Sequence, residues 1–162
     1  MFSNISQTSD PLTQFACVLS ALIHDVDHMG VPNAQLVKSD CELARMYGNK
    51  SVAEQNSVDL AWDLLMEPAY DSLRKCIYKT RAELGRFRQL VVNSVMATDI
   101  VDKELGALRR QRWEKAFAKN SNNSNLNASE HSSRDDINRK ATIVIEHLIQ
   151  ASDVAHTMQH WQ

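Results

Sequence analysis

Apolar side chains recur at helical spacing along most of the 162-residue chain. The first such stretch begins at Asp10-Pro11, an N-cap followed by proline at the first helical position. Its apolar residues continue to Val26, and the helix breakers Gly30 and Pro32 follow. The stretch is apolar nearly all round, so it predicts a helix that is buried on most of its sides.

Further helices are predicted from the same spacing and from signals at their ends. Two of them begin at the spacing of a capping box, from Ser51 to Glu54 and from Thr80 to Glu83. The predicted helices after the first cover residues 40–47, 51–66, 68–78, 80–95, 102–119 and 137–158. Residues 120–133 are nearly all Asn and Ser and cannot bury enough apolar surface, so we expect an exposed, mobile loop there.

The composition agrees with an all-α protein of one domain. Apolar residues make up 43% of the chain, and only four glycines and three prolines are present. The 18 basic and 20 acidic side chains give a net charge of −2, which argues against a surface for nucleic acid or anionic lipid.

The expected location is intracellular. Three cysteines, odd in number and widely spaced, indicate reduced, buried thiols rather than a disulfide framework. No segment is long and apolar enough to span a bilayer, and no secretory signal is visible. We therefore expect a cytoplasmic protein, or one at the cytosolic face of a membrane if the full-length protein carries transmembrane segments.

The most informative segment follows the first apolar stretch and contains His24, Asp25, Asp27 and His28. On a continuous helix the two histidines, four residues apart, would point into one cavity with Asp25 beside them. Imidazole and carboxylate together are the ligand set of a catalytic divalent metal. The alternative is a pair of hydrogen-bonded core histidines. Four ionisable groups within five residues are costly to bury without a metal or a solvated pocket, which favours the functional interpretation.

Three other polar positions are candidates, and each has a plain alternative. Asp153 follows the apolar stripe of the last predicted helix, and taken alone it is better interpreted as a solvated surface aspartate. Thr98 and Asp99 follow an apolar helix, where both residue types are ordinary at a helix end. Glu54 already has a structural role if it belongs to a capping box.

Four segments of the chain are similar, in order, to four segments of one enzyme family. They are LSALIHDVDHMGVPN, ARMYGNKSVAEQ, SVMATDI and IQASDVAHTMQHW. Together they resemble the class I 3′,5′-cyclic nucleotide phosphodiesterases, which belong to the wider His-Asp phosphohydrolase superfamily. The resemblance covers essentially the whole chain and implies an all-α, multi-helix catalytic domain of the HD type.

The resemblance implies a centre of two divalent metals. His24, Asp25 and Asp153 would be ligands of a tightly bound zinc. Asp25 would also bridge to a second metal, magnesium or manganese, whose other ligands are largely water. Two close cations activate water and stabilise the charge that develops as the phosphodiester bond breaks.

It also implies roles for residues around the metals. Glu54 and Thr98 would hold metal-bound waters by hydrogen bonds, and His28 would lie near the attacking oxygen. Asn33, together with Asp25 and Asp153, would contribute to substrate binding.

The chain also departs from the family pattern. The family's first zinc histidine and the histidine that protonates the leaving 3′ oxygen belong to an upstream motif, and residues 1–9 contain no histidine. The glutamine and the aromatic clamp that hold the purine lie beyond Gln162. Asn56-Ser57 stands where many members have paired histidines, and His156 where asparagine is common. We therefore expect residues 1–162 to be a domain incomplete at both ends and inactive by itself.

The expected activity of the parent protein is hydrolysis of cyclic AMP, cyclic GMP or both to the 5′-monophosphate. Its partner would be the cyclic nucleotide substrate, with no nucleic acid, and regulatory domains could be fused to it. Two alternatives remain open. One is a catalytically inactive phosphodiesterase-like module for binding or scaffolding, and the other is a superfamily member that acts on a different phosphate ester.

Overall fold

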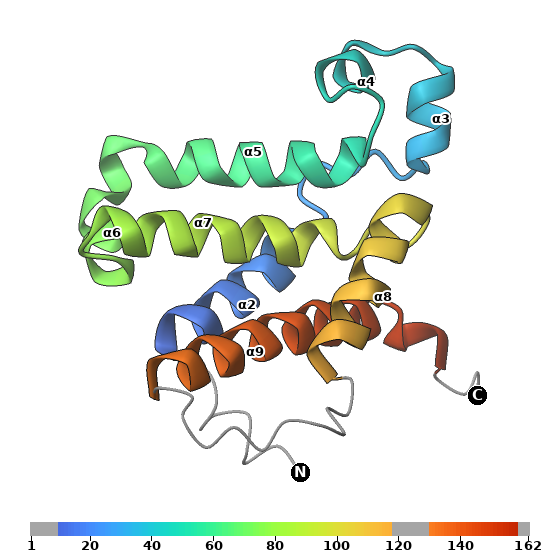
Figure 1. Ribbon diagram of the computed structural model, residues 1–162. Helices are drawn as coiled ribbons and strands as arrows, with labels where there is room; N and C mark the ends of the chain where they lie inside the picture. The colour runs from blue at the N-terminus through green and yellow to red at the C-terminus, as the bar shows by residue number, and fades with distance from the viewer. Residues whose placement is uncertain (1–9, 118–129, 159–162) are drawn as a thin grey trace.

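The computed structural model describes residues 10–117 and 130–158. Within these ranges the chain is helical and contains no strand, which confirms the predicted all-α fold (Figure 1). The α-helices are α2 Pro11–Ile23, α3 Asn33–Lys38, α4 Glu42–Met46, α5 Val52–Met66, α6 Asp71–Ile77, α7 Arg81–Met96, α8 Lys103–Phe117 and α9 Glu130–Asp153. Short 3₁₀ turns cover Pro68–Tyr70 and Ala155–Met158.

Several helix ends follow the sequence signals. The carboxylate of Asp10 accepts hydrogen bonds from the backbone N–H groups of Leu12 and Thr13 and so caps α2. The capping box from Thr80 to Glu83 is present in full at the start of α7. These two N-termini are therefore fixed by local sequence, as predicted.

Other boundaries differ from the prediction. Helix α3 was not predicted, and α9 begins at Glu130 instead of residue 137. Residues 130–133 of the predicted Asn/Ser-rich loop are thus helical, and residues 120–129 lie outside the described residues. The side chain of His156 also lies outside the described part of the chain.

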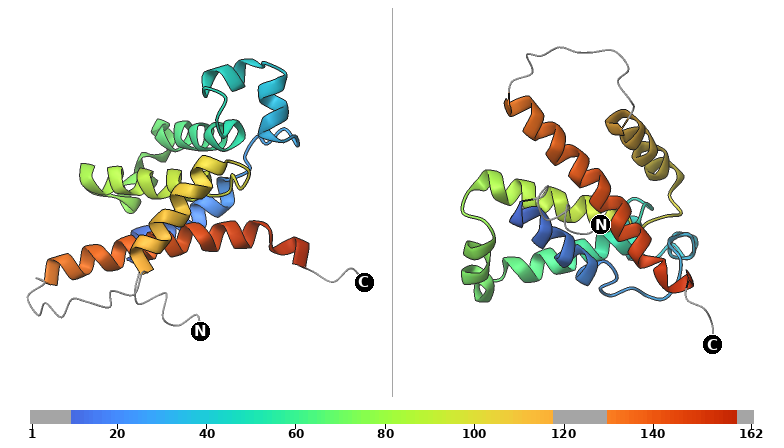
Figure 2. Two further views of the ribbon diagram at one scale, coloured as in Figure 1. Left: turned by 45° about the vertical axis from the view of Figure 1, so that its right-hand side comes forward. Right: turned by 90° about the horizontal axis from the view of Figure 1, so that it is seen from below.

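The main core lies where α2, α5 and α7 meet around Phe87, which is completely buried. Helices α5 and α7 run side by side, and α2 lies between α7 and α9 (Figures 1 and 2). The rings of Phe15, Trp62 and Tyr78 surround Phe87 at centroid distances of 5.9, 6.0 and 6.1 Å. Packing against α7 on one side and α9 on the other fixes the position of α2.

Helix α8 is joined to α9 by an ion pair in which the carboxylate is buried and the guanidinium is exposed. Glu146 is only 2% exposed, and Arg112 Nη1 lies 3.0 Å from both of its carboxylate oxygens. A buried carboxylate needs such a partner, because transfer from water is costly for an unpaired charge. The pair therefore holds α9, which carries Asp153, against α8.

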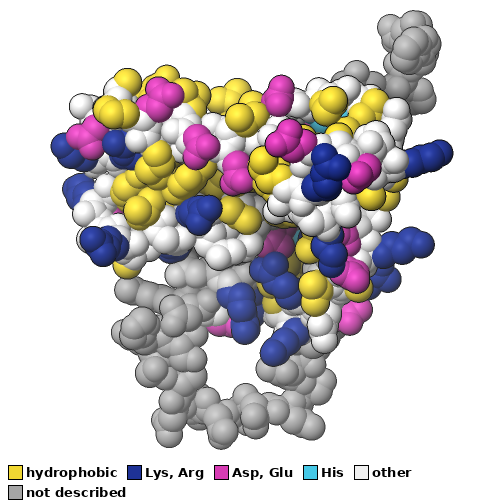
Figure 3. Space-filling view, turned by 90° about the horizontal axis from the view of Figure 1, so that it is seen from above, with side chains coloured by type: hydrophobic (Ala, Val, Ile, Leu, Met, Phe, Trp, Pro, Cys, Tyr) yellow, Lys and Arg dark blue, Asp and Glu magenta, His cyan; other side chains and the backbone are white. Residues whose placement is uncertain are grey.

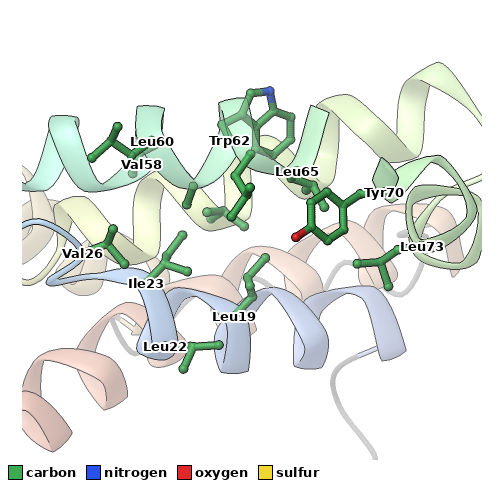
Figure 4. Close-up of a pocket in the computed structure, with 13 residues that line it drawn as sticks. Leu19, Leu22, Ile23, Val26, Val58, Leu60, Trp62, Leu65, Tyr70 and Leu73 are labelled. Atoms are coloured by element: carbon green, nitrogen blue, oxygen red, sulfur yellow. The ribbon is translucent and has the colours of Figure 1, made fainter. Parts of the chain in front are cut away.

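An open apolar groove of about 470 Å³ runs between α2 and α5 (Figure 4). Leu22 on α2 is 78% exposed at this groove, so the prediction that this helix is buried on most sides is wrong for the described structure. Hydrophobic side chains also gather on the side of the molecule that carries α6 (Figure 3). No helix within residues 10–117 and 130–158 is long and apolar enough to cross a membrane.

Candidate metal centre

His24 lies at the C-terminal end of α2, which ends at Ile23. Its backbone N–H still donates to the carbonyl of Ser20, as in the last turn of a helix. Residues 24–27 then form a turn in which Asp27 has a left-handed backbone, with φ of 60°. The prediction that His24 and His28 lie on one face of a continuous helix is therefore wrong, because the helix does not reach His28.

The three expected zinc ligands lie together nevertheless. His24, Asp25 and Asp153 each offer one ligand atom, and these atoms all lie within 4.8 Å of one another. His24 Nε2 is 3.4 Å from Asp25 Oδ2 and 3.3 Å from Asp153 Oδ1. The first two residues come from the end of α2 and the third from the end of α9, and contacts between these helices bring them together.

The orientation of the imidazole suits a metal ligand. His24 Nδ1 lies 2.9 Å from the carbonyl oxygen of Ala21. A carbonyl can only accept, so Nδ1 carries the hydrogen, and in a neutral ring Nε2 presents its lone pair to the two carboxylates. Three atoms with lone pairs then converge, and a cation between them satisfies all three. Backbone bonding of the second ring nitrogen is the usual way in which proteins orient a ligating histidine.

The cluster is open on one side. The side chains of His24 and Asp153 are 22% and 32% exposed, whereas that of Asp25 is 65% exposed. Three protein ligands with access to solvent are typical of catalytic zinc sites, which keep a position open for water or substrate. The residues present therefore fit a divalent cation.

His28 occupies a separate position from this cluster. It is exposed, and its Nδ1 accepts a hydrogen bond of 3.1 Å from the backbone N–H of Gly30. Burial raises the pKa of Glu54, and a positive charge on His28, when its ring is protonated, opposes this rise, so the two side chains lie near each other. His28 thus faces the space near Glu54 and is not among the three converging ligand atoms.

The predicted capping box at Ser51 and Glu54 is wrong. Ser51 has a left-handed backbone with φ of 39° and makes no side-chain cap hydrogen bond to α5. The capping oxygen comes instead from Asn33, whose Oδ1 accepts from the backbone N–H of Ala53 at 3.0 Å. Asn33 Nδ2 donates to Glu54 Oε2 at 2.8 Å. Glu54 is therefore not part of a capping box with Ser51, and its carboxylate is held by an amide from the start of α3.

Asp99, which is 5% exposed, completes a polar network behind Glu54. Its Oδ2 accepts from Ser51 Oγ at 2.7 Å and from Asn33 Nδ2 at 3.4 Å. Burial raises the pKa of Glu54 above its ordinary value, and the negative charge of Asp99 acts in the same direction. The hydrogen bond from Asn33 opposes this shift because it favours the ionised carboxylate.

Thr98 directly follows the end of α7, which agrees with its interpretation as an ordinary helix-end residue. It is half-buried, and its hydroxyl donates to the carbonyl oxygen of Val95 at 2.7 Å. The hydroxyl oxygen can still accept a hydrogen bond. A role in holding water near the metals stays a prediction.

Three residues that support the site had no predicted role. Asp99 was noted only as a helix-end residue, and Asn56-Ser57 only as a departure from the family pattern. Asn56 and Ser57 contact Asp27 and Val26, which directly follow the His24-Asp25 pair. Long-range hydrogen bonds of this kind have no signature in local sequence, although the polar pair early in an apolar helix was a usable signal.

The whole chain matches one known protein family. The family model described as 3′5′-cyclic nucleotide phosphodiesterase matches residues 1–162. The chain belongs to this family. The all-α, HD-type fold and the resemblance seen in the four sequence segments are thereby confirmed.

Curated relatives support the same family. The chain is 35% identical over 96 residues to the probable 3′,5′-cyclic-AMP phosphodiesterase pde-4 of Caenorhabditis elegans, covering 59% of this chain and 14% of that protein. It is 37% identical over 89 residues to 3′,5′-cyclic-AMP phosphodiesterase 4C of Mus musculus, covering 55% and 12%. The chain thus spans only a small part of these phosphodiesterases.

Solved structures show the same fold. LmjPDEB1 in complex with IBMX superposes with a TM-score of 0.68 at 25% identity, covering 96% of this chain and 42% of that structure. The phosphodiesterase domain of the RhoPDE fusion protein from the choanoflagellate Salpingoeca rosetta gives a TM-score of 0.64 at 25% identity, covering 90% and 41%. The described helices therefore correspond to less than half of either structure.

Proposed function

We propose that this chain carries the metal-binding part of a phosphodiesterase that hydrolyses 3′,5′-cyclic nucleotides to 5′-monophosphates. The observation that carries the proposal is the convergence of His24, Asp25 and Asp153 within 4.8 Å, in a chain that belongs to this family. Because the chain spans a fraction of its relatives, the activity is proposed for the full-length protein that contains it.

In this proposal His24, Asp25 and Asp153 would hold a zinc ion, and the exposed carboxylate of Asp25 would also serve as a ligand of a second ion, magnesium or manganese. The donor set supports the assignment, because one imidazole and two carboxylates suit a catalytic divalent metal. When bound, these cations supply Lewis-acid polarisation of the phosphodiester and activation of water. Asp25 and Asp153 would contribute to substrate binding as ligands of these cations.

Residues outside the three-ligand cluster supply further polar groups to the site. Glu54 presents a carboxylate that accepts hydrogen bonds, and Thr98 presents a hydroxyl oxygen, so both suit the positioning of water. His28, which is exposed near Glu54, is available to the reacting phosphate. Both amide hydrogens of Asn33 are directed at carboxylates, Glu54 and Asp99, so we assign Asn33 to the orientation of Glu54 in preference to contact with substrate.

Cyclic AMP is the substrate we favour, since the two relatives cited above are named as cyclic-AMP phosphodiesterases. Cyclic GMP is the second substrate to test. The three cysteines are all free thiols, and they are half-buried or exposed instead of buried as predicted. Free thiols support action in a reducing compartment such as the cytoplasm. Regulatory domains fused to the catalytic domain are compatible with the larger size of the relatives.

The experiment measures hydrolysis of cyclic AMP and cyclic GMP by the full-length protein with zinc and magnesium. Asp25→Asn and Asp153→Asn should each lower turnover by more than about 100-fold, because even residues that only orient metal ligands cost about 10–100-fold. Asp63→Asn, which changes an exposed carboxylate on α5, is the matched control and should leave turnover unchanged.

Three results would contradict the proposal. Tight binding of cyclic nucleotides without hydrolysis would indicate an inactive binding module. Hydrolysis of other phosphate esters alone would indicate a different member of the superfamily. Full activity in Asp153→Asn would remove the assigned metal centre.

A further inference from the structure

We propose that Asn56 and Ser57 are positioning residues for the turn that presents the candidate metal ligands. They lie side by side in the second turn of α5, and both reach across to residues 26 and 27. The inference rests on the proposed function, because it concerns the geometry of the same site.

Ser57 fixes the backbone directly after Asp25. It is completely buried, and its hydroxyl lies 2.7 Å from the carbonyl oxygen of Val26. The same hydroxyl lies 3.0 Å from the carbonyl oxygen of Ala53 within α5. The shorter contact is the tertiary one, so it is the contact that ties the turn to α5.

Asn56 fixes the next residue. It is 7% exposed, and its Nδ2 donates to Asp27 Oδ2 at 3.0 Å. Asp27 has the left-handed backbone that ends the turn, a conformation that an L-residue other than glycine adopts at some cost. A hydrogen bond from a buried amide holds the Asp27 side chain in the place that this conformation requires.

The backbone hydrogen bonds of the turn itself are local. The N–H of Val26 donates to the carbonyl of Ile23, and the N–H of His28 donates to that of Asp25. Such bonds shape the turn but do not place it relative to α5. The contacts from Asn56 and Ser57 supply that placement.

Helix α5 therefore connects two parts of the site. Its first turn carries Glu54, and its second turn holds the residues that follow His24 and Asp25. Glu54 and the metal ligands are thus positioned by one rigid element. A small displacement of the turn against α5 would change the distance between the proposed metals and Glu54. Metal affinity and activity both depend strongly on such distances.

The experiment uses a charge exchange and a matched serine control in the full-length protein. Asn56→Asp places two carboxylates against each other, and the double variant Asn56→Asp with Asp27→Asn restores one donor and one acceptor. Ser57→Ala removes the tertiary hydroxyl contact. Ser20→Ala is the control, because Ser20 is equally buried and its hydroxyl donates to the carbonyl of Ala16 within its own helix.

Two readouts are needed. Zinc affinity is measured by competition with a chelator, and amide hydrogen exchange of residues 24–30 is measured in the metal-free protein. We expect Asn56→Asp and Ser57→Ala to weaken zinc binding by about 10-fold or more and to speed exchange in this segment. The double variant should recover most of both effects, and Ser20→Ala should show neither.

Unchanged exchange and zinc affinity in Asn56→Asp and Ser57→Ala would overturn the inference, as would equal losses in Ser20→Ala. A double variant no better than Asn56→Asp alone would do the same. Failure of the proposed function has a different signature: the wild-type protein itself would neither bind zinc nor hydrolyse cyclic nucleotides, and the exchange measurement would still test whether Asn56 and Ser57 hold the turn.

Discussion

His24 Nε2 lies 3.3 Å from Asp153 Oδ1, although the two residues are 129 positions apart in the chain. The contact joins the end of α2 to the end of α9. Since α2 packs on both α7 and α9, formation of the site depends on assembly of the helical core. Metal binding and folding should therefore be coupled.

That coupling gives the first prediction. Zinc should raise the thermal midpoint of the wild-type protein, because a ligand that binds only the folded state stabilises it by about 2.7 kcal/mol at 100 times its dissociation constant. Asp153→Asn should lose most of this stabilisation, whereas Asp63→Asn should keep it. Thermal unfolding at increasing zinc concentrations measures the effect, and equal zinc responses in wild type and Asp153→Asn would contradict it.

The second prediction concerns Glu54. Because Ser51 does not cap α5 through its side chain, Glu54→Gln should leave the helix intact but lower turnover by about 10–100-fold. Glu83→Gln is the matched control, since Glu83 belongs to a complete capping box and glutamine also serves there. Steady-state kinetics of both variants give the comparison. Equal turnover in the two would mean that the Glu54 carboxylate has no part in catalysis.

The third prediction concerns Asn33, which both caps α5 and binds Glu54. Asn33→Ala should lower the free energy of unfolding by about 1–3 kcal/mol, through a lost cap and the lost amide hydrogen bond to the half-buried carboxylate of Glu54. It should also raise the pKa of Glu54 further, because the amide favours the ionised form. Denaturant unfolding tests the first effect, and a shift of the acidic limb of the pH–rate profile to higher pH tests the second. A profile identical to wild type would show that the amide does not control Glu54.

The fourth prediction concerns stability and pH at Glu146. Burial raises the pKa of this carboxyl above its ordinary value of 4.5, although Arg112 opposes the rise. The folded state then holds a proton that the unfolded state has released, so this contribution to stability is present below about pH 4.5 and is lost as pH rises through the folded pKa. Glu146→Gln should remove that loss. Denaturant unfolding at several pH values measures it.

A second carboxylate provides a control of opposite sign for this experiment. Backbone N–H groups of Lys79 and Thr80 lower the pKa of Glu83. Its contribution is therefore present at higher pH and is lost as pH falls through the folded pKa. Glu83→Gln should make the decline of stability with rising pH steeper, whereas Glu146→Gln should make it shallower. Changes in the same direction would contradict the assignment.

The two capping-box sequences show what could and could not be predicted. Thr80 to Glu83 forms the predicted box because all of its partners are within four residues. Ser51 to Glu54 has the same spacing, but the Ser51 hydroxyl binds Asp99, 48 positions away, and Asn33 replaces it as the cap. Local sequence contains the first set of partners and none of the second.

The candidate metal ligands and the end of α2 also differ in how far local sequence could predict them. The His24-Asp25 pair was identified from its residue types at the end of an apolar stretch, whereas Asp153 was identified because its sequence context resembles the family. The end of α2 was misplaced because apolar spacing continues to Val26, while the Ser57 hydroxyl approaches the Val26 carbonyl from another helix. Residue types and order were therefore sufficient to single out the three residues that converge, but not to predict the contacts that orient them.

The most direct test of the metal centre is anomalous diffraction at the zinc edge from crystals of the full-length protein. The expected result is one strong peak within about 2.0–2.3 Å of His24 Nε2 and of a carboxylate oxygen from each of Asp25 and Asp153. A zinc ion bound elsewhere, with these three side chains outside coordination distance in an enzyme that hydrolyses cyclic nucleotides, would contradict the assignment.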